Sequence, residues 1–544
     1  MHAFSAMFGG AASLLLASQV MAAGADGTQQ VPPQTTGSIE RPALPASTPP
    51  PVPREVSSPL AVHVAARIEA LAGAAPPAAA PKHDPRSDLE ALRSHYAARA
   101  NEPLWMALDG PTDLGRALAS ALSDAPSHGL DPALLAIPAL DANALANPEA
   151  IGRADVDLSL AALAYARQAR GGRIPDPASM LNSNLDRKPQ LHEPVEVLDR
   201  LSTAVDIGAA LSALNPVHPQ YAALRRAYLA ETGGDGRGKL TAAAKRLRAN
   251  MEFWRWMWDD LGDLHVFNNI PEFVQRVYRD GEVIRTERIV VGELANPSSV
   301  FSRQLQSVVL RPRWRVPESI MVHEVWPSLL RGGGMMRKYG LEITTKSGEP
   351  RDWRTIDWTI DDIRNYHVWQ PPGRNSALGF VKFSFPSQHT IFMHDTPDKW
   401  MFNARQRTLS HGCLRLRNPM QLTEIVLAYD KGWDRAKIED LIARGPLDND
   451  IRIEKRLPIH LAYFTAWADP AGGISYFADI YGHEKRVTQA LDGDWKKIAK
   501  GRDHLAKVQP RFDPRSVASE PAQSRRQSDP SVGDIIGNIF NLGL

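Results

Sequence analysis

The chain contains 544 residues, of which 43% are hydrophobic and 23% are charged, a composition typical of a globular protein with two or three domains. Its formal net charge of +2 gives no reason to expect a nucleic acid as a partner. The chain has one cysteine, Cys413, so an internal disulfide is excluded.

Residues 1–23 have the features of a secretory signal peptide, with an apolar run at residues 14–16 and small residues ending at Ala22 and Ala23. No lysine or arginine precedes the apolar run. An uncleaved membrane anchor is the alternative, but a membrane span requires about 18 or more apolar residues. Gln19 and two glycines interrupt this shorter run, and no later segment is long enough to span. We therefore expect export, cleavage and a mature chain without a membrane span.

The next two regions differ in composition and periodicity. Residues 24–85 are rich in proline and alanine and predict an extended linker. Residues 86–245 predict an all-helical domain, which begins where Ser87 and Glu90 have the spacing of a capping box. This domain carries no catalytic constellation, so its predicted role is that of a scaffold. The predicted helical segments are 113–125, 155–171, 194–214 and 219–230.

Residues 246–440 predict a second, mainly β domain. Its aromatic cluster FWRWMW, residues 253–258, is typical of a core or of a seam between domains. Beyond this cluster apolar and polar residues alternate, and Asp280-Gly281 between two alternating runs predicts a hairpin. Residues 315–350 carry a helical pattern and predict an insertion in this domain.

The expected fold class is therefore multidomain α+β, with a helical scaffold domain followed by a mainly β catalytic domain that carries the insertion. Residues 441–499 are expected to form an extension packed on the catalytic domain. Residues 500–544 are polar and weakly periodic, so they predict a disordered tail.

The lone cysteine lies in the sequence LSHGCLRLRN, residues 409–418. An odd cysteine in an exported protein indicates a free reactive thiol or a bridge between molecules. A structural thiol is the alternative, because unpaired cysteine is among the most often buried residue types. The neighbours His411, Gly412 and Arg415 are polar or turn-forming, whereas a buried thiol would usually lie in an apolar run. We therefore interpret Cys413 as reactive.

A cysteine nucleophile reacts as the thiolate and needs a nearby base, usually a histidine. His411 is adjacent in the sequence, and His394 ends the predicted strand TIFMH, so both are candidates. Gly412 allows a sharp turn, in which backbone N–H groups near Cys413 could face a developing oxyanion. Arg415 would share a face with Cys413 in an extended segment, and its guanidinium suits a substrate carboxylate.

A metal site is the alternative interpretation of this region. The paired spacings of common zinc modules are absent, so neither a metal nor a cofactor is predicted. The residues that such a site would use are His389, His394, Asp395, His411 and Cys413.

Four stretches of the sequence carry a resemblance to a known family. HDTP at 394–397 and SHGCLR at 410–415 resemble the catalytic signature of YkuD-type L,D-transpeptidases, which cross-link peptidoglycan. QPPGRNSALGFVKFSFP at 370–386 and RPRWRVPESI at 311–320 further resemble the large YcbB-like subgroup, in which a helical scaffold domain precedes the catalytic domain. The resemblance is specific within 263–440 and looser elsewhere.

The resemblance implies a role for each matching residue. Cys413 would be the nucleophile and His394 the general base. The insertion at 315–350 would be a mobile lid over the substrate cleft. The remaining residues would shape the site and its oxyanion hole (His411, Gly412 and Ser410) or bind substrate (Arg415, Asn375, Lys382 and Trp314).

The resemblance also implies an activity, namely periplasmic formation of 3–3 cross-links on tetrapeptide stems through a cysteine acyl-enzyme. The implied partners are peptidoglycan stem peptides and cell-wall synthesis proteins. An L,D-carboxypeptidase or another cysteine peptidoglycan hydrolase is the alternative, and an inactive envelope-binding scaffold is the non-enzymatic one. The chain departs from the subgroup in one respect, because no room for a peptidoglycan-binding module separates the two domains.

Overall fold

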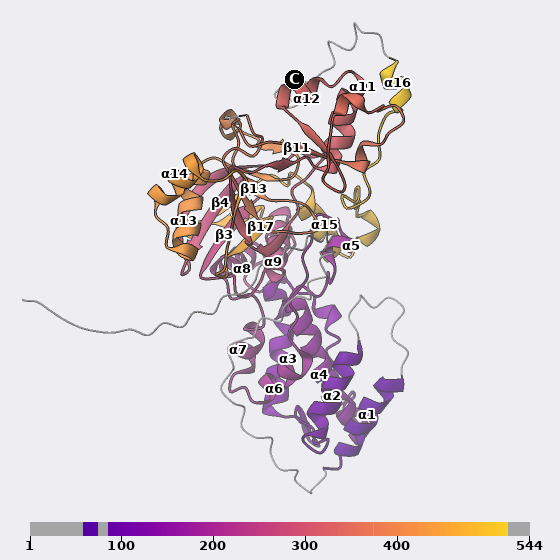
Figure 1. Ribbon diagram of the computed structural model, residues 1–544. Helices are drawn as coiled ribbons and strands as arrows, with labels where there is room; N and C mark the ends of the chain where they lie inside the picture. The colour runs from indigo at the N-terminus through magenta and orange to yellow at the C-terminus, as the bar shows by residue number, and fades with distance from the viewer. Residues whose placement is uncertain (1–57, 74–84, 374, 520–544) are drawn as a thin grey trace, which may run out of the picture. The chain divides into compact units, whose positions relative to one another are not determined.

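The computed structural model of the protein describes residues 58–73, 85–373 and 375–519 (Figure 1). The predicted signal peptide, most of the predicted linker and residues 520–544 lie outside the described residues. Among the described helices, none combines the length and the apolar character that crossing a bilayer requires.

The first part of the described chain is helical and has its own apolar core. Part of the predicted linker belongs to this core, because Val64 and Ile68 of its first helix are buried. The helices are α1 (Ala61–Gly73), α2 (Pro85–Ala97), α3 (Asp113–Ser123), α4 (Pro148–Ala169), α5 (Pro177–Met180), α6 (Pro194–Ser202), α7 (Ile207–Ser212), α8 (Pro219–Glu231) and α9 (Ala242–Arg255), and a short ribbon of β1 (Met106–Ala107) and β2 (Gly110–Pro111) lies between α2 and α3.

The last two of these helices, α8 and α9, share a core with the catalytic sheet rather than with α1 to α4, α6 and α7. Trp254 of α9 stacks on Phe464 with ring centroids 4.6 Å apart. Arg187, which follows α5, donates to the Leu461 carbonyl at 2.7 Å. The aromatic cluster at 253–258 therefore belongs to a shared core.

One large sheet carries the catalytic region, in the order β16-β7-β12-β13-β15-β5-β4-β3-β17-β6, with β14 paired to β5. Helices α13 (Pro419–Lys431), α14 (Arg435–Arg444) and α15 (His483–Leu491) accompany it. A small two-stranded sheet of β18 (Ala466–Ala468) and β19 (Ile474–Tyr476) follows β17 in the sequence. The strands of the large sheet are β3 (Leu264–Asn269), β4 (Val274–Arg279), β5 (Glu282–Gly292), β6 (Phe301–Gln304), β7 (Ser307–Leu310), β12 (Val381–Ser384), β13 (Met393–His394), β14 (Thr408–Ser410), β15 (Leu414–Leu416), β16 (Asn449–Arg452) and β17 (Pro458–Ala462).

The predicted hairpin is present between β4 and β5. Arg279 pairs with Glu282, so Asp280 and Gly281 form a two-residue loop. Both loop residues have positive φ, at 51° and 83°, as a type I′ turn requires. The hairpin predicted from Asp280-Gly281 is therefore confirmed.

Two strands of the sheet come from the segment that we expected to be an extension. β16 pairs with β7, and β17 lies between β3 and β6 with every residue buried. Residues 449–462 thus complete the catalytic sheet instead of packing on it. Their pairing partners are far away in the sequence, so local periodicity did not reveal this arrangement.

The insertion is longer than residues 315–350 and contains strands as well as helices. β7 and β12 pair directly, with Leu310 opposite Val381, so the chain leaves and re-enters the sheet at one point. Residues 311–380, which we call the lid, have a separate apolar core. The lid consists of α10 (Glu318–Ile320), a π-helix (Met321–Val325), α11 (Trp326–Leu330), α12 (Gly334–Tyr339) and a sheet of β10 (Pro350–Arg351), β9 (Glu342–Thr345), β11 (Tyr366–Gln370) and β8 (Trp314–Arg315).

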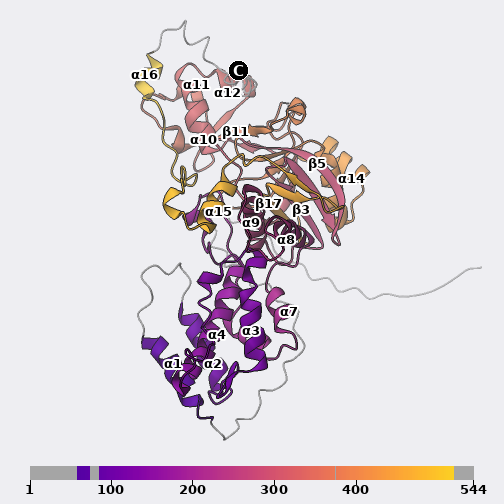
Figure 2. The same ribbon diagram turned by 180° about the vertical axis from the view of Figure 1, so that it is seen from behind.

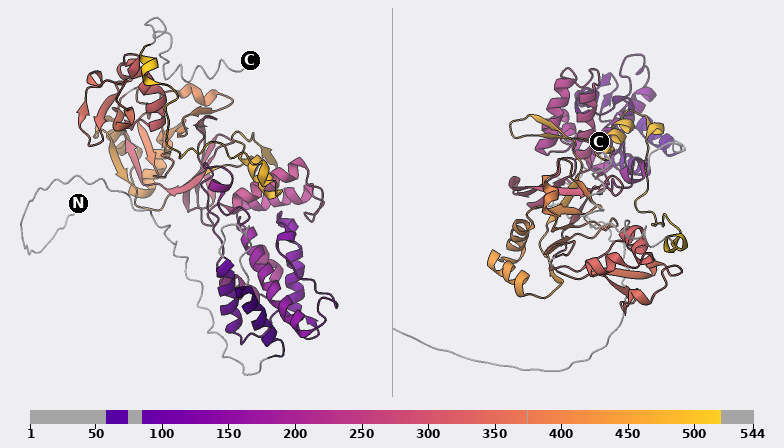
Figure 3. Two further views of the ribbon diagram at one scale, coloured as in Figure 1. Left: turned by 90° about the vertical axis from the view of Figure 1, so that its right-hand side faces the viewer. Right: turned by 90° about the horizontal axis from the view of Figure 1, so that it is seen from above.

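Residues 500–519, which we expected to be disordered, connect the catalytic region with the lid. Helix α16 (Pro514–Ala518) lies beside α11 in both views (Figure 1, Figure 2). Val517 is buried in the lid core, and Phe512 makes an edge contact with Trp326 at 5.5 Å. The yellow segment that includes α16 also lies beside the lid in both views of Figure 3. Apolar residues spaced along a polar segment explain why composition alone did not predict this contact.

Candidate active site

Cys413 lies directly before β15, which runs parallel to β13. His394 pairs with Arg415, and the Leu414 amide donates to the Phe392 carbonyl at 3.1 Å. Side chains alternate along a strand, so Cys413 and Arg415 share one face of the sheet with Phe392 and His394. The sequence pattern predicted the face that Cys413 shares with Arg415, and the parallel pairing adds His394 to it.

A tight turn precedes Cys413 and is fixed by hydroxyl groups. Gly412 has φ of 110°, a conformation that an L side chain rarely adopts. Ser298 Oγ donates to the Gly412 carbonyl at 2.6 Å, and Ser410 Oγ donates to the Cys413 carbonyl at 2.5 Å. Ser410 Oγ also accepts from the Gly412 amide at 3.2 Å. Within the described part of the chain no such partner is found for the Cys413 amide, so this N–H is available for an oxyanion.

The Cys413 thiol is partly buried and points at the backbone of a neighbouring loop. Its Sγ donates to the Thr390 carbonyl at 3.9 Å. Burial raises the pKa of Cys413 to about 11, although a backbone hydrogen bond from Phe392 and the charges of Lys382 and Arg415 act in the opposite direction. The group is therefore a thiol at neutral pH and needs a base to remove its proton.

His394 has the properties of that base. Its Nδ1–H donates to the Asp395 carbonyl, which leaves Nε2 without a proton and able to accept one. Burial lowers the pKa of His394 to about 3, and the charge of Arg415 contributes to this. The imidazole is therefore neutral throughout the physiological range.

The pKa of His411 is shifted in the opposite direction. Its Nε2 lies 3.0 Å from Glu324 Oε1 of the lid and 3.9 Å from Glu293 Oε1. Burial alone would lower the pKa of His411, but the hydrogen bond and charge of Glu324, together with the charge of Glu293, raise it. Titratable groups whose environments separate their pKa values often have separate roles. The upward shift favours the protonated form of His411, which cannot accept the thiol proton, and His394 is therefore the better candidate for the base.

The predicted substrate-binding residues lie in two places. Arg415 is on the face of Cys413, but its guanidinium already donates to Thr396 Oγ1 at 3.2 Å and pairs with Asp398 at 3.3 Å. Lys382 is opposite His394 on β12, and its Nζ lies 4.7 Å from the centre of the Phe392 ring. Asn375 and Trp314 belong to the lid, not to the strands beside Cys413.

Sequence reasoning missed a buried hydrogen-bond network behind the thiol. His389 Nε2 lies 2.9 Å from Asp186 Oδ2, and its Nδ1 lies 2.6 Å from His504 Nε2. His389 precedes Thr390, so this network supports the loop whose carbonyl faces the thiol. A cavity of about 310 Å³ opens here between Glu318 of the lid, residues 388–390 and residues 504–508. Its walls come from three distant segments, so no local signal marked it.

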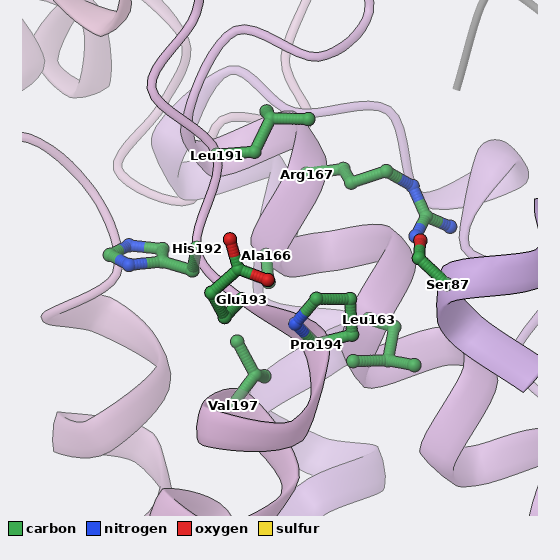
Figure 4. Close-up of a pocket in the computed structure, with 9 residues that line it drawn as sticks. All are labelled: Ser87, Leu163, Ala166, Arg167, Leu191, His192, Glu193, Pro194 and Val197. Carbon is green, nitrogen blue, oxygen red and sulfur yellow. The ribbon is translucent and has the colours of Figure 1, made fainter. Parts of the chain in front are cut away.

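A second cavity of about 250 Å³ lies in the helical region (Figure 4). No cysteine lines it, and its Arg167 is engaged by Asp88 at 2.5 Å. Its lining residues are Ser87, Leu163, Ala166, Arg167, Leu191, His192, Glu193, Pro194 and Val197.

Across residues 58–73, 85–373 and 375–519, no group of three or more histidine, cysteine or acidic side chains is arranged to hold a metal ion. His411 and His394 instead point to different partners, a carboxylate and a backbone carbonyl. The groups near the Cys413 thiol include the neutral imidazole of His394, the Cys413 backbone N–H and the charges of Lys382 and Arg415.

Comparison with known families gives two matches. Residues 90–227 match a family model described as a Scaffold domain, and residues 263–438 match the model of the YkuD L,D-transpeptidase catalytic domain. The chain therefore has a Scaffold domain that is followed in the sequence by a YkuD L,D-transpeptidase catalytic domain. The predicted combination of a scaffold domain with an L,D-transpeptidase catalytic domain and the predicted fold class are confirmed.

The chain is also similar to a curated Haemophilus influenzae protein named "Putative L,D-transpeptidase", with 32% identity over 263 residues. The match covers 48% of this chain and 51% of that protein, so the chain spans about half the length of the curated relative. Two solved structures also match, an "Ldtfm-avibactam carbamoyl enzyme" and an "L,D-transpeptidase from Mycobacterium smegmatis". The match to the first covers 37% of this chain and 50% of that structure's chain, at 10% sequence identity. The match to the second covers 36% of this chain and 59% of that structure's chain, at 12% identity. Their TM-scores of 0.17 and 0.16 are too low to establish a common fold.

Proposed function

We propose that the protein is a peptidoglycan L,D-transpeptidase that forms 3–3 cross-links on tetrapeptide stems through an acyl-enzyme on Cys413. The observation that carries this proposal is the placement of a partly buried thiol on the same face of the sheet as a neutral His394, whose Nδ1–H is held by a backbone carbonyl so that its Nε2 can accept a proton. This pair lies within the matched L,D-transpeptidase domain. Peptidoglycan stem peptides are the proposed substrate, the periplasm is the proposed location, and cell-wall synthesis proteins are proposed partners.

In the first half-reaction His394 Nε2 accepts the proton of Cys413 Sγ as the sulfur attacks the carbonyl carbon of the third stem residue, expected to be diaminopimelate. The carbonyl oxygen becomes an oxyanion, which the free Cys413 amide can stabilise. The bond between this carbon and the nitrogen of the terminal D-alanine then breaks. The imidazolium of His394 returns its proton to the departing amine, which leaves a thioester.

In the second half-reaction a side-chain amine of another stem attacks the thioester carbon. The amine loses a proton to His394 as the new carbon–nitrogen bond forms. The thiolate of Cys413 departs and recovers that proton, which completes an amide cross-link and restores the enzyme. If water attacked instead, the product would be a tripeptide, and the enzyme would be an L,D-carboxypeptidase.

The lid favours transfer over hydrolysis as the proposed outcome. A transferase must keep water away from its thioester until an amine arrives, and closing segments commonly perform this task. Glu324 of the lid reaches the turn that precedes Cys413, so the lid is close enough to the thioester to exclude water.

The test is to incubate the mature protein with muropeptides that carry tetrapeptide stems and to identify the products by mass spectrometry. Dimers that have lost the donor's terminal D-alanine are expected, and the Cys413→Ala variant should yield none. Tripeptides alone would replace the transferase with the carboxypeptidase. Unchanged substrate from folded protein would favour the inactive envelope-binding scaffold.

A further inference from the structure

Glu324 joins the lid to the catalytic turn. It lies in the π-helix between α10 and α11, and its Oε1 is 3.0 Å from His411 Nε2. The side chain is only 17% exposed, and that of His411 is 29% exposed, so the contact is partly shielded from water. His411 is two residues from Cys413, so any movement of this ion pair reaches the turn that holds the nucleophile.

The π-helix contributes to the direction in which Glu324 points. A π turn inserts one residue into an α-helical path, which rotates the following side chains by about 100° around the axis. Such turns are frequent at functional sites. The neighbouring lid residues Met321, Val322 and Val325 are buried in the lid core, so the π-helix is fixed there on its other faces.

Glu293 approaches the same histidine from the body of the catalytic domain. Its Oε1 is 3.9 Å from His411 Nε2 and accepts from Asn296 Nδ2 at 2.7 Å. Its backbone amide donates to the Ser410 carbonyl at 2.7 Å, so it is part of the turn's own support. The charged groups that face His411 are therefore Glu324 from the lid, Glu293 from the body and the opposing charge of Arg415. Of these, Glu324 alone moves with the lid.

Building on the proposed function, we propose that Glu324 is a positioning residue that docks the lid on the catalytic turn through His411, and that this docking protects the thioester from water. The ion pair requires a protonated His411. In the folded protein the pKa of His411 is raised. The ion pair is therefore present at pH values below this pKa and is lost as the pH rises through it. The ratio of dimer to tripeptide should therefore fall as the pH rises through the same range.

The test compares Glu324→Gln with Glu349→Gln, a matched control at an exposed lid position away from His411. Glutamine keeps the size of Glu324 but not its charge, and Glu324→Asp tests for partial rescue. In Glu324→Gln the dimer-to-tripeptide ratio should fall about fivefold near neutral pH and lose its pH dependence. The control should match the wild-type protein.

A second measurement does not depend on turnover. The pKa of His411, followed by NMR with the ring carbons labelled and assigned through His411→Gln, should be lower in Glu324→Gln than in Glu349→Gln. Hydrogen exchange of residues 318–345 should be faster in Glu324→Gln. An unchanged His411 pKa or unchanged lid exchange would overturn the positioning role even if dimers are still made. Absence of dimers from the wild-type protein would instead contradict the proposed function and leave these two measurements interpretable.

Discussion

The catalytic sheet and the lid differ in how they are held. The sheet shares one continuous apolar core with α8 and α9, and its strands pair across large sequence separations. The lid has a separate core and is continuous with the sheet where the chain leaves β7 and returns at β12. Its other contacts with the rest include the Glu324–His411 ion pair, residues 500–519, and hydrogen bonds at its base such as Arg313 N to Asp448 Oδ1 and Phe380 N to Asp395 Oδ2. The proposed reactive groups therefore lie on the part with the large continuous core, whereas the lid, whose proposed role is to control access, has a smaller core of its own. Segments with few attachments open at lower free energy than the global core.

The largest expected effect comes from removing the proposed nucleophile. Cys413→Ala should abolish the single covalent adduct that a carbapenem, as the family resemblance implies, forms with the wild-type protein. Intact-mass analysis measures this directly. Because the residue is on the sheet, lid exchange should not change. An adduct that persists on the alanine variant would place the nucleophile elsewhere.

The next effect separates the two histidines. His394→Ala should slow acylation by roughly 10²- to 10⁴-fold, the range of a general base. His411→Ala should act mainly through the turn and the lid, and should therefore change the product ratio more than acylation. Stopped-flow acylation and product analysis on both variants distinguish these effects. The assignment of the base is wrong if His411→Ala is the more damaging change for acylation.

The pH dependence of the His394 effect follows from its low pKa. A base must be unprotonated to act, and His394, with a pKa of about 3, is unprotonated at every pH above that value. The thiol stays protonated up to a pKa of about 11, so the same proton transfer is needed throughout. The acylation rate of the wild-type protein divided by that of His394→Ala should therefore be constant between about pH 5 and pH 9. A ratio that falls below a midpoint near pH 6.5 would indicate that His394 is more exposed to water than its contacts suggest.

A smaller effect is expected where residues 500–519 hold the lid. Phe512→Ala removes the edge contact with Trp326 and should loosen the lid by about 2 kcal/mol. Hydrogen exchange of the lid should accelerate accordingly, and the global midpoint of unfolding should change little. Arg515→Ala, at an exposed position of α16, is the matched control. Equal exchange in both variants would mean that this segment does not restrain the lid.

Local patterns predicted the parts of the site that local geometry decides. The sequence around His394 and Gly412 indicated a strand and a turn beside Cys413, and Asp280-Gly281 indicated its hairpin. These features depend on a few consecutive residues and on backbone conformations that only some of them adopt easily.

The remaining features depend on contacts between distant segments. The docking of Glu324 on His411 requires the lid to fold back onto the sheet, which periodicity does not encode. The place of β17 inside the sheet and the Asp186–His389 contact have the same origin. The opposite pKa shifts of His394 and His411 follow from contacts of this kind, so the sequence did not predict them either.

The smallest expected effects come from replacing two glycines by alanine, one in the catalytic sheet and one in the lid. Gly281 in the β4–β5 hairpin and Gly340 at the end of α12 both have positive φ, at 83° and 59°, and an added Cβ would meet no atom within 4 Å at either position. Replacing either by alanine should therefore cost about 1 kcal/mol through backbone strain alone. If the lid opens independently of the sheet, Gly281→Ala should lower the global free energy of unfolding, measured by denaturant titration. Gly340→Ala should leave that value nearly unchanged and should instead accelerate hydrogen exchange within the lid. Equal losses of global stability from both variants would mean that lid and sheet unfold as one cooperative unit, and the lid would then need a smaller motion than full undocking to admit substrate.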